Sequence, residues 1–581
     1  MSGLLLLSYA VFAQTDGHFD PVLTFLGISS PEEADAYDVE RLTDLLDKPL
    51  KINMASDSHI VASSLFTRYQ TASLKDYLSR HGDVLSLTEL AAVDGFGEDF
   101  VSRLSPFISL ESSSPPGERH SDIKYISNEW ALRCAVRTGN QMSYGGKYRL
   151  SFDDSAIMTL SVSSSYDSWP QPSAVRGSLA LKVGKANVIF GDFNARFGQG
   201  LVIWNGMSVG GLSSPAALSR RPTGLSQPWS FTGSSSFTGA AVEVPAGRMI
   251  CTFMLDASKA LKFEAESFPL TAAADISWYR NNGQLSLTSA TSVTLPDSAG
   301  EKTFEYASIA FSQRWSSSGV DLFSELALEF LSLSPALMCG ISMKLAEKLT
   351  SAAMLRYYHQ SYSVSSSSGP RSGTATSNEQ GVTIAGEYKS YDKLLGVFSI
   401  DAACFPEPRS RDEEWSHQIK AATDWKWTIS PEFEIDVKVA ERIRSWGHRF
   451  KTESKVGVVY KKGIYTNILR LHTVRCDGTG LLGYLETGIS GDIIKTFLRF
   501  GLFCIDDWDD RIYVYDRDAP GTFNVPAYYG RGLWTALTGS WRFARWGRLY
   551  LRASYIAYPF MAVEKQKPGR AELRFQIQFD L

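Results

Sequence analysis

The chain lacks any run of about 18 apolar residues, the length that a helix needs to cross a membrane. Catalytic motifs are missing too, since the 581 residues hold no G-x-S-x-G elbow, no H-E-x-x-H helix and no Walker loop. Histidine is scarce, with 8 residues, of which His359, His417, His448 and His472 lie in the strand-rich region described below. We therefore expect no enzyme, and the alternative left open is a hydrolase whose catalytic groups are scattered along the chain.

Cysteine spacing excludes the common metal and redox motifs. The six cysteines stand far apart and form no C-x-x-C pair: Cys134, Cys251, Cys339, Cys404, Cys476 and Cys504. We accordingly expect no cofactor. Cys134 falls on the apolar face of a predicted strand, where a small hydrophobic residue is a better interpretation than a disulfide partner.

The N-terminal segment lacks the Lys or Arg that usually precedes the core of a signal peptide. Leu4 to Phe12 is nevertheless a short apolar core, and Val11-Phe12-Ala13 before Gln14 is a small-residue cleavage pattern. We predict a signal peptide at residues 1–13, with a buried N-terminal strand as the alternative. No cysteine follows the core, so a lipoprotein anchor is not supported.

Alternation of apolar and polar residues is what the chain has in abundance. The last nine residues place polar side chains between five apolar ones, which are Leu573, Phe575, Ile577, Phe579 and Leu581. A period of two indicates a β-strand with one apolar and one wet face. Outer-membrane barrels usually close with such a C-terminal strand, whose apolar face meets lipid.

The same pattern recurs along the chain in segments of about 9–11 residues, the length that a tilted strand needs to cross a bilayer. Clear examples begin at Trp130, Phe433 and Leu549. We predict a mostly β protein whose residues 128–581 form a large transmembrane antiparallel barrel of about 18–24 strands in the outer membrane. Aromatic residues make up 12% of the chain, which suits the aromatic girdles of such barrels. A soluble propeller or sandwich is the alternative.

Residues 28–111 differ in character and predict a small all-α domain. Helix starts are indicated by Ser30-Pro31-Glu32-Glu33 and by the capping box Ser86-Leu87-Thr88-Glu89. Gly95-Phe96-Gly97 then predicts a tight turn before a helix from about Glu98 to Leu104. Two short helices joined in this way make a helix-hairpin-helix.

This stretch resembles the helix-hairpin-helix domain of the ComEA-type competence DNA receptors, which is also similar to domain 2 of RuvA. The matching residues begin at Lys51-Ile52-Asn53-Met54-Ala55-Ser56 and continue through Leu87-Thr88-Glu89-Leu90 to Val93-Asp94-Gly95-Phe96-Gly97. The resemblance implies that Asn53, Ala55, Gly95, Phe96 and Gly97 form a turn that contacts DNA or protein. The first hairpin departs from the family pattern, because Ser63-Ser64-Leu65-Phe66-Thr67 holds no glycine.

The charge of this domain disfavours DNA. Residues 32–111 hold 15 Asp or Glu against 7 Lys or Arg, a net charge of −8, and Glu98 and Asp99 stand where a phosphate would sit. DNA affinity comes largely from cationic contacts to phosphates. We therefore expect the domain to contact an envelope protein, and DNA binding is the weaker alternative.

Residues 112–127, which include Ser112-Ser113-Ser114-Pro115-Pro116-Gly117, predict a polar linker. Because the C-terminal strand ends on the periplasmic side and the strand number is even, the barrel also begins there. The helical domain is thus expected to hang in the periplasm.

The segment GDFNARFGQGLVIWNG, residues 191–206, resembles a family of outer-membrane barrels fused to N-terminal helix-hairpin-helix domains, as do Arg220-Arg221 and Asp510-Arg511-Ile512-Tyr513-Val514-Tyr515. The resemblance implies architecture rather than an activity. Gly198 and Gly200 predict a bulge, and Asp192, Arg196 and Gln199 are candidates for a polar cluster in the lumen that acts as a constriction or plug latch. The alternative is a corner that lets strands curve.

Two further features of the sequence are an acidic cluster and two polar stretches. Asp506, Asp507, Asp509 and Asp510 are weak candidates for a metal site, because oxygen clusters bind calcium but the spacing of an EF-hand loop is missing. The Ser- and Gly-rich stretches 205–236 and 361–381 predict extracellular loops or lumen plugs.

Together these patterns predict a non-enzymatic outer-membrane barrel whose periplasmic helical module acts in protein docking, gating, or envelope transport or assembly. The expected partners are outer-membrane lipid and a periplasmic or outer-membrane protein. The alternatives are a DNA-uptake component that uses the helical module as receptor, and a barrel hydrolase.

Overall fold

The computed structural model of the chain describes most of its 581 residues. The described ranges are 20–28, 36–55, 57–112, 126–139, 141–152, 155–206, 213–231, 236–258, 267–280, 282–296, 303–317, 319–390, 393–410, 414–522, 524–561 and 568–581. The predicted signal peptide, the predicted helix start at Ser30 and nearly all of the predicted linker lie outside these ranges. Within them, no helix is both long and apolar enough to cross a membrane.

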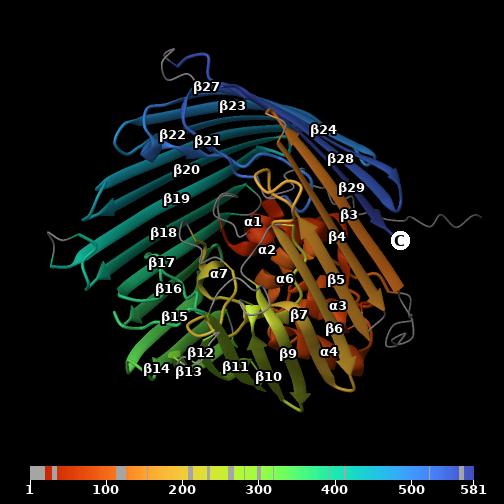
Figure 1. Ribbon diagram of the computed structural model, residues 1–581, viewed down its shortest axis with the longest axis vertical. Helices are drawn as coiled ribbons and strands as arrows, with labels where there is room; N and C mark the ends of the chain where they lie inside the picture. Colours follow the sequence, from red (N-terminus) through yellow and green to blue (C-terminus); the bar gives the residue numbers. More distant parts are fainter. Residues whose placement is uncertain are drawn as a thin grey trace, which may run out of the picture.

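Most of the chain forms one closed antiparallel barrel, which in the described ranges has 24 strands and confirms the predicted fold class (Figure 1). Its strands are β3 (Ile126–Arg137), β4 (Gln141–Phe152), β5 (Ala156–Ser163), β6 (Ala174–Val183), β7 (Ala186–Arg196), β9 (Phe237–Ala246), β10 (Met249–Asp256), β11 (Ser267–Arg280), β12 (Gly283–Pro296), β13 (Thr303–Ser317), β14 (Val320–Glu329), β15 (Ser334–Ala346), β16 (Leu349–Tyr358), β17 (Glu379–Ser390), β18 (Leu394–Phe405), β19 (Ser416–Ser430), β20 (Phe433–Arg444), β21 (Phe450–Lys462), β22 (Tyr465–Arg475), β23 (Thr479–Ser490), β24 (Ile494–Ile505), β27 (Gly530–Ala544), β28 (Gly547–Ala557) and β29 (Arg570–Asp580).

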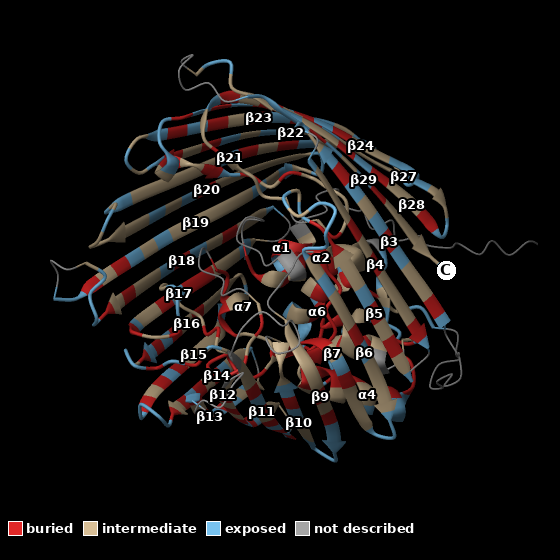
Figure 2. Ribbon diagram, viewed as in Figure 1, coloured by how far each residue is buried: buried red, intermediate tan, exposed pale blue. Residues whose placement is uncertain are grey.

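The C-terminal strand closes the barrel as the alternation predicts. β29 pairs with β3 from Glu572 opposite Arg137 to Asp580 opposite Glu129. Leu573 and Phe575 are exposed on the outer face, while Glu572 and Gln576 are buried on the inner face. Burial alternates in the same way along neighbouring strands (Figure 2). Apolar side chains therefore face outward, where lipid surrounds a transmembrane barrel.

The two ends of the barrel differ in their connections. Turns of two or three residues join strands at one end, for instance 184–185 between β6 and β7 and 347–348 between β15 and β16. This short-turn end also holds the start of β3 and the end of β29. Exposed tryptophans lie near this end of the barrel, close to the ends of their strands: Trp130, Trp278, Trp315, Trp427 and Trp541. Short turns mark the periplasmic end of an outer-membrane barrel, and Trp marks a membrane interface.

Most connections at the opposite end are longer, and three of these contribute a lining inside the lumen. Residues 197–231, where described, contain α7 (Pro215–Leu218) and β8 (Gly224–Ser226), while residues 506–529 contain β25 (Ile512–Tyr513) and β26 (Ala527–Tyr528). We call residues 197–206, 213–231 and 359–378 the inner loops. Leu201 and Tyr362 of these loops share a hydrophobic core with Phe193, Tyr306 and Phe323 of the barrel's inner face.

The N-terminal residues form a helical module of six helices within the described ranges. These are α1 (Asp20–Leu26), α2 (Ala36–Asp47), α3 (Asp57–Ser63), α4 (Arg68–His81), α5 (Leu87–Ala91) and α6 (Glu98–Leu104), joined by the two-residue parallel strands β1 (Leu50–Lys51) and β2 (Ile108–Ser109). Ser86 caps α5 by accepting a hydrogen bond from the Glu89 N–H at 3.1 Å, as predicted. The helix α1 precedes the expected start at residue 28 and packs into the same core.

The position of the helical module differs from the expected one. Its helices lie within the ring of strands, next to β3–β7 and β9 (Figure 1). The module makes hydrogen bonds and ion pairs with side chains of the inner barrel face, described below. The described helices thus lie inside the barrel, where oppositely charged side chains of module and wall are paired, and not below it as expected.

Candidate functional site

The first helical hairpin, α3 and α4, anchors the module to the inner loops. Its turn holds Ser64 at a φ of +49°, so serine adopts the left-handed conformation that glycine favours, although the sequence has no glycine there. The carbonyl of Leu65 in this turn accepts a hydrogen bond from Arg221 at 3.0 Å. The Arg221 guanidinium lies over the Phe25 ring, 4.1 Å from its centroid. The hairpin without glycine is thus the one that packs inside the barrel.

Ion pairs with little exposure join the module to the barrel wall. Among the described residues, three such pairs have side chains at most 15% exposed, and they are Glu40–Lys147, Arg68–Glu243 and Asp38–Arg196. Their nitrogen-to-oxygen distances are 2.6, 2.5 and 3.1 Å. A buried ion pair adds little net stability, but removing one partner leaves the other charge buried without a partner and destabilises the structure by about 3–5 kcal/mol. The pairs therefore specify where the module sits.

Further contacts fix the same orientation. The Asn282 N–H, in a short turn, donates a hydrogen bond to the Tyr69 hydroxyl at 2.8 Å, and the Tyr69 ring stacks on Tyr279 at 5.8 Å between centroids. At the other side, the Ser214 N–H donates to the Gly27 carbonyl at 2.9 Å. The module is thus held between the short-turn end of the barrel and the inner loops.

Two carboxylates of α2 show what this enclosure does to ionisation. Burial by itself would raise the pKa of Asp38, but the Arg196 and Arg41 guanidinium groups outweigh it and hold the pKa at about 2. Burial raises the pKa of Asp44 to about 7, since the attraction of Lys147 is opposed by the like charge of Glu40. Asp38 is therefore a permanent anion, whereas Asp44 titrates near neutral pH.

The second hairpin, α5 and α6, faces open space. Phe96 is buried in the module core, while Gly97 at φ +70° has no atom within 4 Å of the position that a Cβ would take. Glu98 and Asp99 in the first turn of α6 are exposed. Gly95 packs against the Tyr69 ring, where a Cβ would collide. Gly95, Phe96 and Gly97 all line a cavity, and Gly97 is the exposed residue of the three.

Asn53 and Ala55, the other residues implied by the resemblance, lie in the module's own framework. The Asn53 side-chain amide donates to the carbonyls of Val84 at 2.9 Å and Leu110 at 3.1 Å, and its oxygen accepts from the Val84 N–H. The Ala55 N–H donates to the Lys51 carbonyl at 2.7 Å. The asparagine is buried and ties three segments of the module together.

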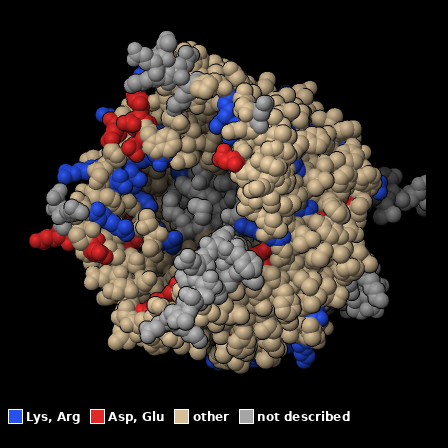
Figure 3. Space-filling view, in the orientation of Figure 1, with Lys and Arg blue, Asp and Glu red and all other residues tan. Residues whose placement is uncertain are grey.

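The cavity beside the second hairpin has a volume of about 1340 Å³ and reaches the short turns of the barrel, and we call it the vestibule. It lies between the module, the inner loops and the wall from β13 to β24. Among its described lining residues, 19 are Lys or Arg and 12 are Asp or Glu. The lysines on the strands of the wall are Lys344, Lys389, Lys420, Lys426, Lys438, Lys455 and Lys461. In space-filling view the molecule is hollowed, and Lys and Arg gather at one side of the hollow (Figure 3). The described lining of the vestibule therefore carries a net positive charge.

The segment FGQGL forms a tight turn that latches onto the barrel wall. The Glu325 carboxylate on β14 accepts hydrogen bonds from the N–H groups of Gln199 and of Leu201, the latter at 3.4 Å. Gly198 at φ +56° leaves no room for a Cβ, which would lie 2.8 Å from that carboxylate. The Tyr362 hydroxyl donates to the Leu201 carbonyl at 2.7 Å, joining two inner loops. The sequence predicts extracellular loops or lumen plugs for residues 205–236 and 361–381, and side chains of both stretches pack into the core on the inner side of the barrel.

The three candidates for a polar cluster have separate partners. Asp192 accepts from the Gly177 N–H at 2.9 Å and the Thr238 hydroxyl at 2.6 Å, which ties β7 to its neighbours. Arg196 pairs with Asp38 of the module. The Gln199 side-chain oxygen accepts from the Arg220 N–H at 3.0 Å. Arg196 is thus the candidate that contacts the module.

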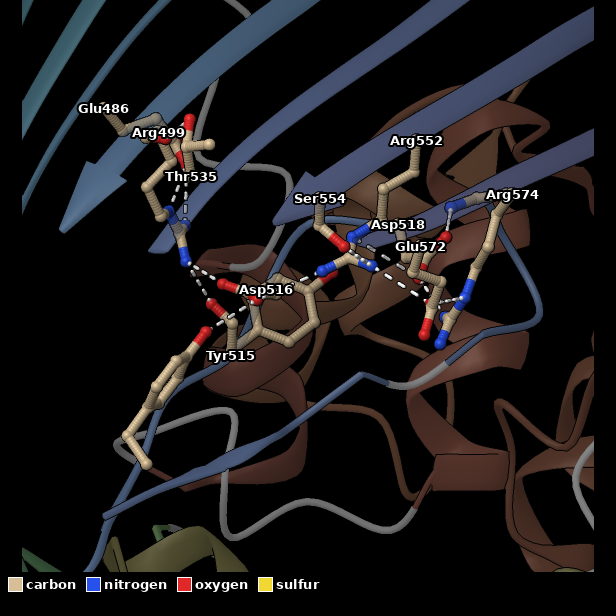
Figure 4. Close-up of polar contacts among 12 residues, drawn as sticks. Glu486, Arg499, Tyr515, Asp516, Asp518, Thr535, Arg552, Ser554, Glu572 and Arg574 are labelled. Atoms are coloured by element: carbon tan, nitrogen blue, oxygen red, sulfur yellow. Dashed lines mark hydrogen bonds and ion pairs between the residues drawn. The ribbon is translucent and has the colours of Figure 1, made fainter. Parts of the chain in front are cut away.

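A second inward connection is held by a ladder of charges (Figure 4). Asp516 accepts from Arg499 at 2.7 Å and from Arg552 at 3.2 Å, while Asp518 pairs with Arg574. These arginines belong to β24, β28 and β29. The ladder fixes residues 515–518 against the wall beside the module.

The weak metal candidates make other contacts. Asp507 caps the following turn, and Asp506 pairs with Arg531 at 3.1 Å. The buried Asp510 accepts from the N–H groups of Cys476 and Gly478, both at 2.7 Å. Asp509 lies 3.2 Å from the imidazole of His448. The described residues therefore use these carboxylates singly rather than as one oxygen cluster.

Sequence reasoning missed the residues that dock the module, namely Glu40, Arg68, Lys147 and Glu243. Each falls in an ordinary helix or strand pattern, and the partners are separated by 107 and 175 positions in the sequence. The one available signal was charge: an acidic module of −8 precedes a barrel region in which Lys and Arg exceed Asp and Glu.

Comparison with known proteins gives limited likeness. No protein-family model matches the chain, and no curated protein matches it. Among solved structures, it is similar to the copper transporter OprC (8% identity, 80% of this chain and 82% of that chain, TM-score 0.40) and the siderophore receptor PirA from Pseudomonas aeruginosa (7%, 80% and 82%, 0.40). It is also similar to the P pilus usher PapC translocation pore (9%, 78% and 99%, 0.36). TM-scores below 0.5 carry no argument about function, which has to come from the site.

Proposed function

We propose that this protein is an outer-membrane channel closed by its own N-terminal helical module. The observation that carries the proposal is the set of ion pairs, shielded from solvent, that hold the module inside the lumen. A barrel that only anchors a periplasmic domain needs no such charge matching. A plug needs such charge matching, because it has to bind at one position in the lumen and be able to leave that position.

The uneven filling of the lumen supports a channel. The inner loops pack against apolar and small side chains over β9–β17, so that side is dry. The vestibule side is open and rich in charge. Buried charge is tolerated where it is paired or hydrated, and rings of charged side chains set the selectivity of pores. Removal of the module would extend the vestibule along a hydrophilic wall.

The short-turn end, where the second hairpin faces the vestibule, corresponds to the periplasmic end under the usual topology of such barrels. The hairpin around Gly97 is therefore the part of the plug that an envelope protein would reach first. In this proposal, docking of a partner opens the channel. A partner that pulls on α5 and α6 also pulls on α2 and α4 of the same module, and so acts against the ion pairs that hold the module in the lumen.

DNA uptake stays the alternative. It requires phosphates to approach the Gly97 turn beside Glu98 and Asp99, against the charge of the module. Titration of the full chain with duplex and single-stranded DNA across a salt series tests it. Micromolar binding that weakens steeply with salt would favour DNA uptake over protein docking, and no binding at low salt would exclude it.

The channel itself is tested by solute flux into liposomes that contain the purified protein. Arg68→Ala combined with Lys147→Ala leaves the buried carboxylates of Glu243 and Glu40 without partners. The module should then leave the lumen, and solute flux should rise several-fold over that of the unaltered protein. Lys48→Ala is the matched control, because Lys48 pairs with Asp580 at an exposed site where such pairs contribute about 0–1 kcal/mol. Equal flux for all three proteins would contradict the proposal.

A further inference from the structure

A cluster of metal-ligating side chains lies at the end of the barrel opposite the short turns. His448, Cys476 and Asp477 each offer one ligand atom, and these atoms lie within 4.8 Å of one another. They come from the connection between β20 and β21 and from the one between β22 and β23. We propose that this cluster binds a zinc ion through thiolate, imidazole and carboxylate. The inference is independent of the proposed channel function.

The imidazole is oriented as a metal ligand requires. One nitrogen, Nε2, lies 3.2 Å from a carboxylate oxygen of Asp509, and the other, Nδ1, lies 2.7 Å from Asp477 Oδ1. Histidines that bind metals usually donate their second N–H to a carboxylate, which fixes the ring and its tautomer. Asp509 fills that role, while Nδ1 is left beside the oxygen and sulfur of the other two ligands.

The turn that carries two of the ligands is held rigidly. Asp510 is fully buried, and its two oxygens accept hydrogen bonds from the N–H groups of Cys476 and Gly478 at 2.7 Å each. Residues 476–478 are therefore fixed in place before any ion arrives. Asp509 and Asp510 belong to the connection between β24 and β27, so three neighbouring connections meet at the cluster.

The donor set selects the metal. A thiolate with an imidazole suits zinc, whereas calcium and magnesium take oxygen ligands only. Three protein ligands leave the fourth tetrahedral position for water. When the thiol of Cys476 loses its proton, one thiolate and one carboxylate carry two negative charges. These offset the two positive charges of Zn²⁺, so the three ligands and the ion together are near neutral.

Cobalt(II) is a spectroscopic probe of such a site, because thiolate ligation gives a charge-transfer band in the near ultraviolet and tetrahedral geometry gives strong visible bands. Titration of the full-length protein in detergent should yield both bands at a one-to-one ratio. Zinc should then abolish them at stoichiometric amounts, while calcium in about tenfold excess over the protein leaves them unchanged.

Variants connect the bands to the residues. Cys476→Ser should remove the charge-transfer band, and His448→Gln should weaken cobalt binding at least tenfold. Cys504→Ser is the matched control, because Cys504 is an exposed free thiol on β24 outside the cluster. Heat-modifiable migration on a denaturing gel shows that each variant keeps its barrel. The proposal is overturned if the native protein gives no charge-transfer band, if Cys476→Ser retains it, or if calcium displaces cobalt as readily as zinc does.

Discussion

At the scale of single residues, the pair Glu40–Lys147 matters most, since both side chains are at most 2% exposed and the Lys147 ammonium also lies 4.6 Å from the Trp229 ring centroid. Pairing of opposite charges between the module and the barrel wall determines where the module binds in the lumen. Neither residue stands out in its own segment, because a lysine on the wet face of a strand and a glutamate in a helix are common.

We predict that Lys147→Ala weakens docking of the module by about 3–5 kcal/mol, because it leaves the Glu40 carboxylate buried without a partner. Hydrogen exchange of α2 measures the effect. Glu40→Gln in the same background removes the stranded charge and should recover most of the loss. An α2 that exchanges equally fast in native and Lys147→Ala protein would contradict the role of the pair.

Asp44 predicts a pH dependence. Its pKa is raised to about 7 in the docked module against an ordinary value of 3.8, so the docked state holds an extra proton between these values. The contribution of Asp44 to docking is greatest below pH 3.8, weakens as the pH rises towards 7, and stays at the weaker level above it. Asp44→Asn should match the native protein at low pH and dock more firmly at pH 8. Hydrogen exchange of α2 at pH 5 and pH 8 checks this, and a variant with the native pH dependence would exclude Asp44 as the cause.

At the scale of elements, the FGQGL turn is the latch between the inner loops and the wall. Gly198→Ala should destabilise it, because alanine at positive φ is strained and its Cβ meets the Glu325 carboxylate. Gly184→Ala is the control, since Gly184 has φ +63° in a short turn and nothing within 4 Å. Gly198→Ala should lower the stability of residues 197–206 by about 1–3 kcal/mol more than the control. Equal effects on hydrogen exchange in this segment would show that the contact with Glu325 is unimportant.

The elements themselves were largely predictable. Period-two alternation depends only on neighbouring residues, so the strands that begin near Trp130, Phe433 and Leu549 and the closing strand all lie where the pattern puts them. The helix cap was predictable for the same reason, since Ser86 caps the helix that directly follows it in the sequence. Ser64 shows the limit of local rules, because a serine at positive φ forms a turn for which the pattern demands glycine.

At the scale of the whole molecule, the position of the module was not predictable. It depends on contacts such as Tyr69 with Asn282, 213 positions apart, which leave no periodic trace. A polar linker and an acidic domain are equally compatible with a free module. Only the structure shows that the opposite charges of module and wall are used at close range, where screening by salt is weak.

The Lys-rich vestibule predicts ion selectivity. Once the module is displaced by mild urea, the channel should pass anions better than cations, because Lys and Arg outnumber Asp and Glu along the vestibule. The reversal potential in a KCl gradient measures this. Replacing Lys420, Lys438 and Lys455 with Gln should shift the preference towards cations. The same replacement at Lys185, Lys393 and Lys462, which are exposed at the short turns, should leave it nearly unchanged. A cation-selective native channel would contradict the role assigned to the vestibule.

The central claim, that the module closes the barrel and opens it by leaving, is tested most directly by single-channel conductance with a reversible lock. Ile28 and Ser213 form a β-bridge between the module and an inner loop, so a cysteine at each position can form a disulfide that ties the module down. Lys51 and Ser109 face each other within the module, and cysteines there provide a matched disulfide that leaves the module free to move. In mild urea, the account predicts conductance for the reduced Ile28→Cys/Ser213→Cys protein, none for its oxidised form, and conductance for the control in both redox states. Equal conductance of the locked and unlocked forms would contradict it.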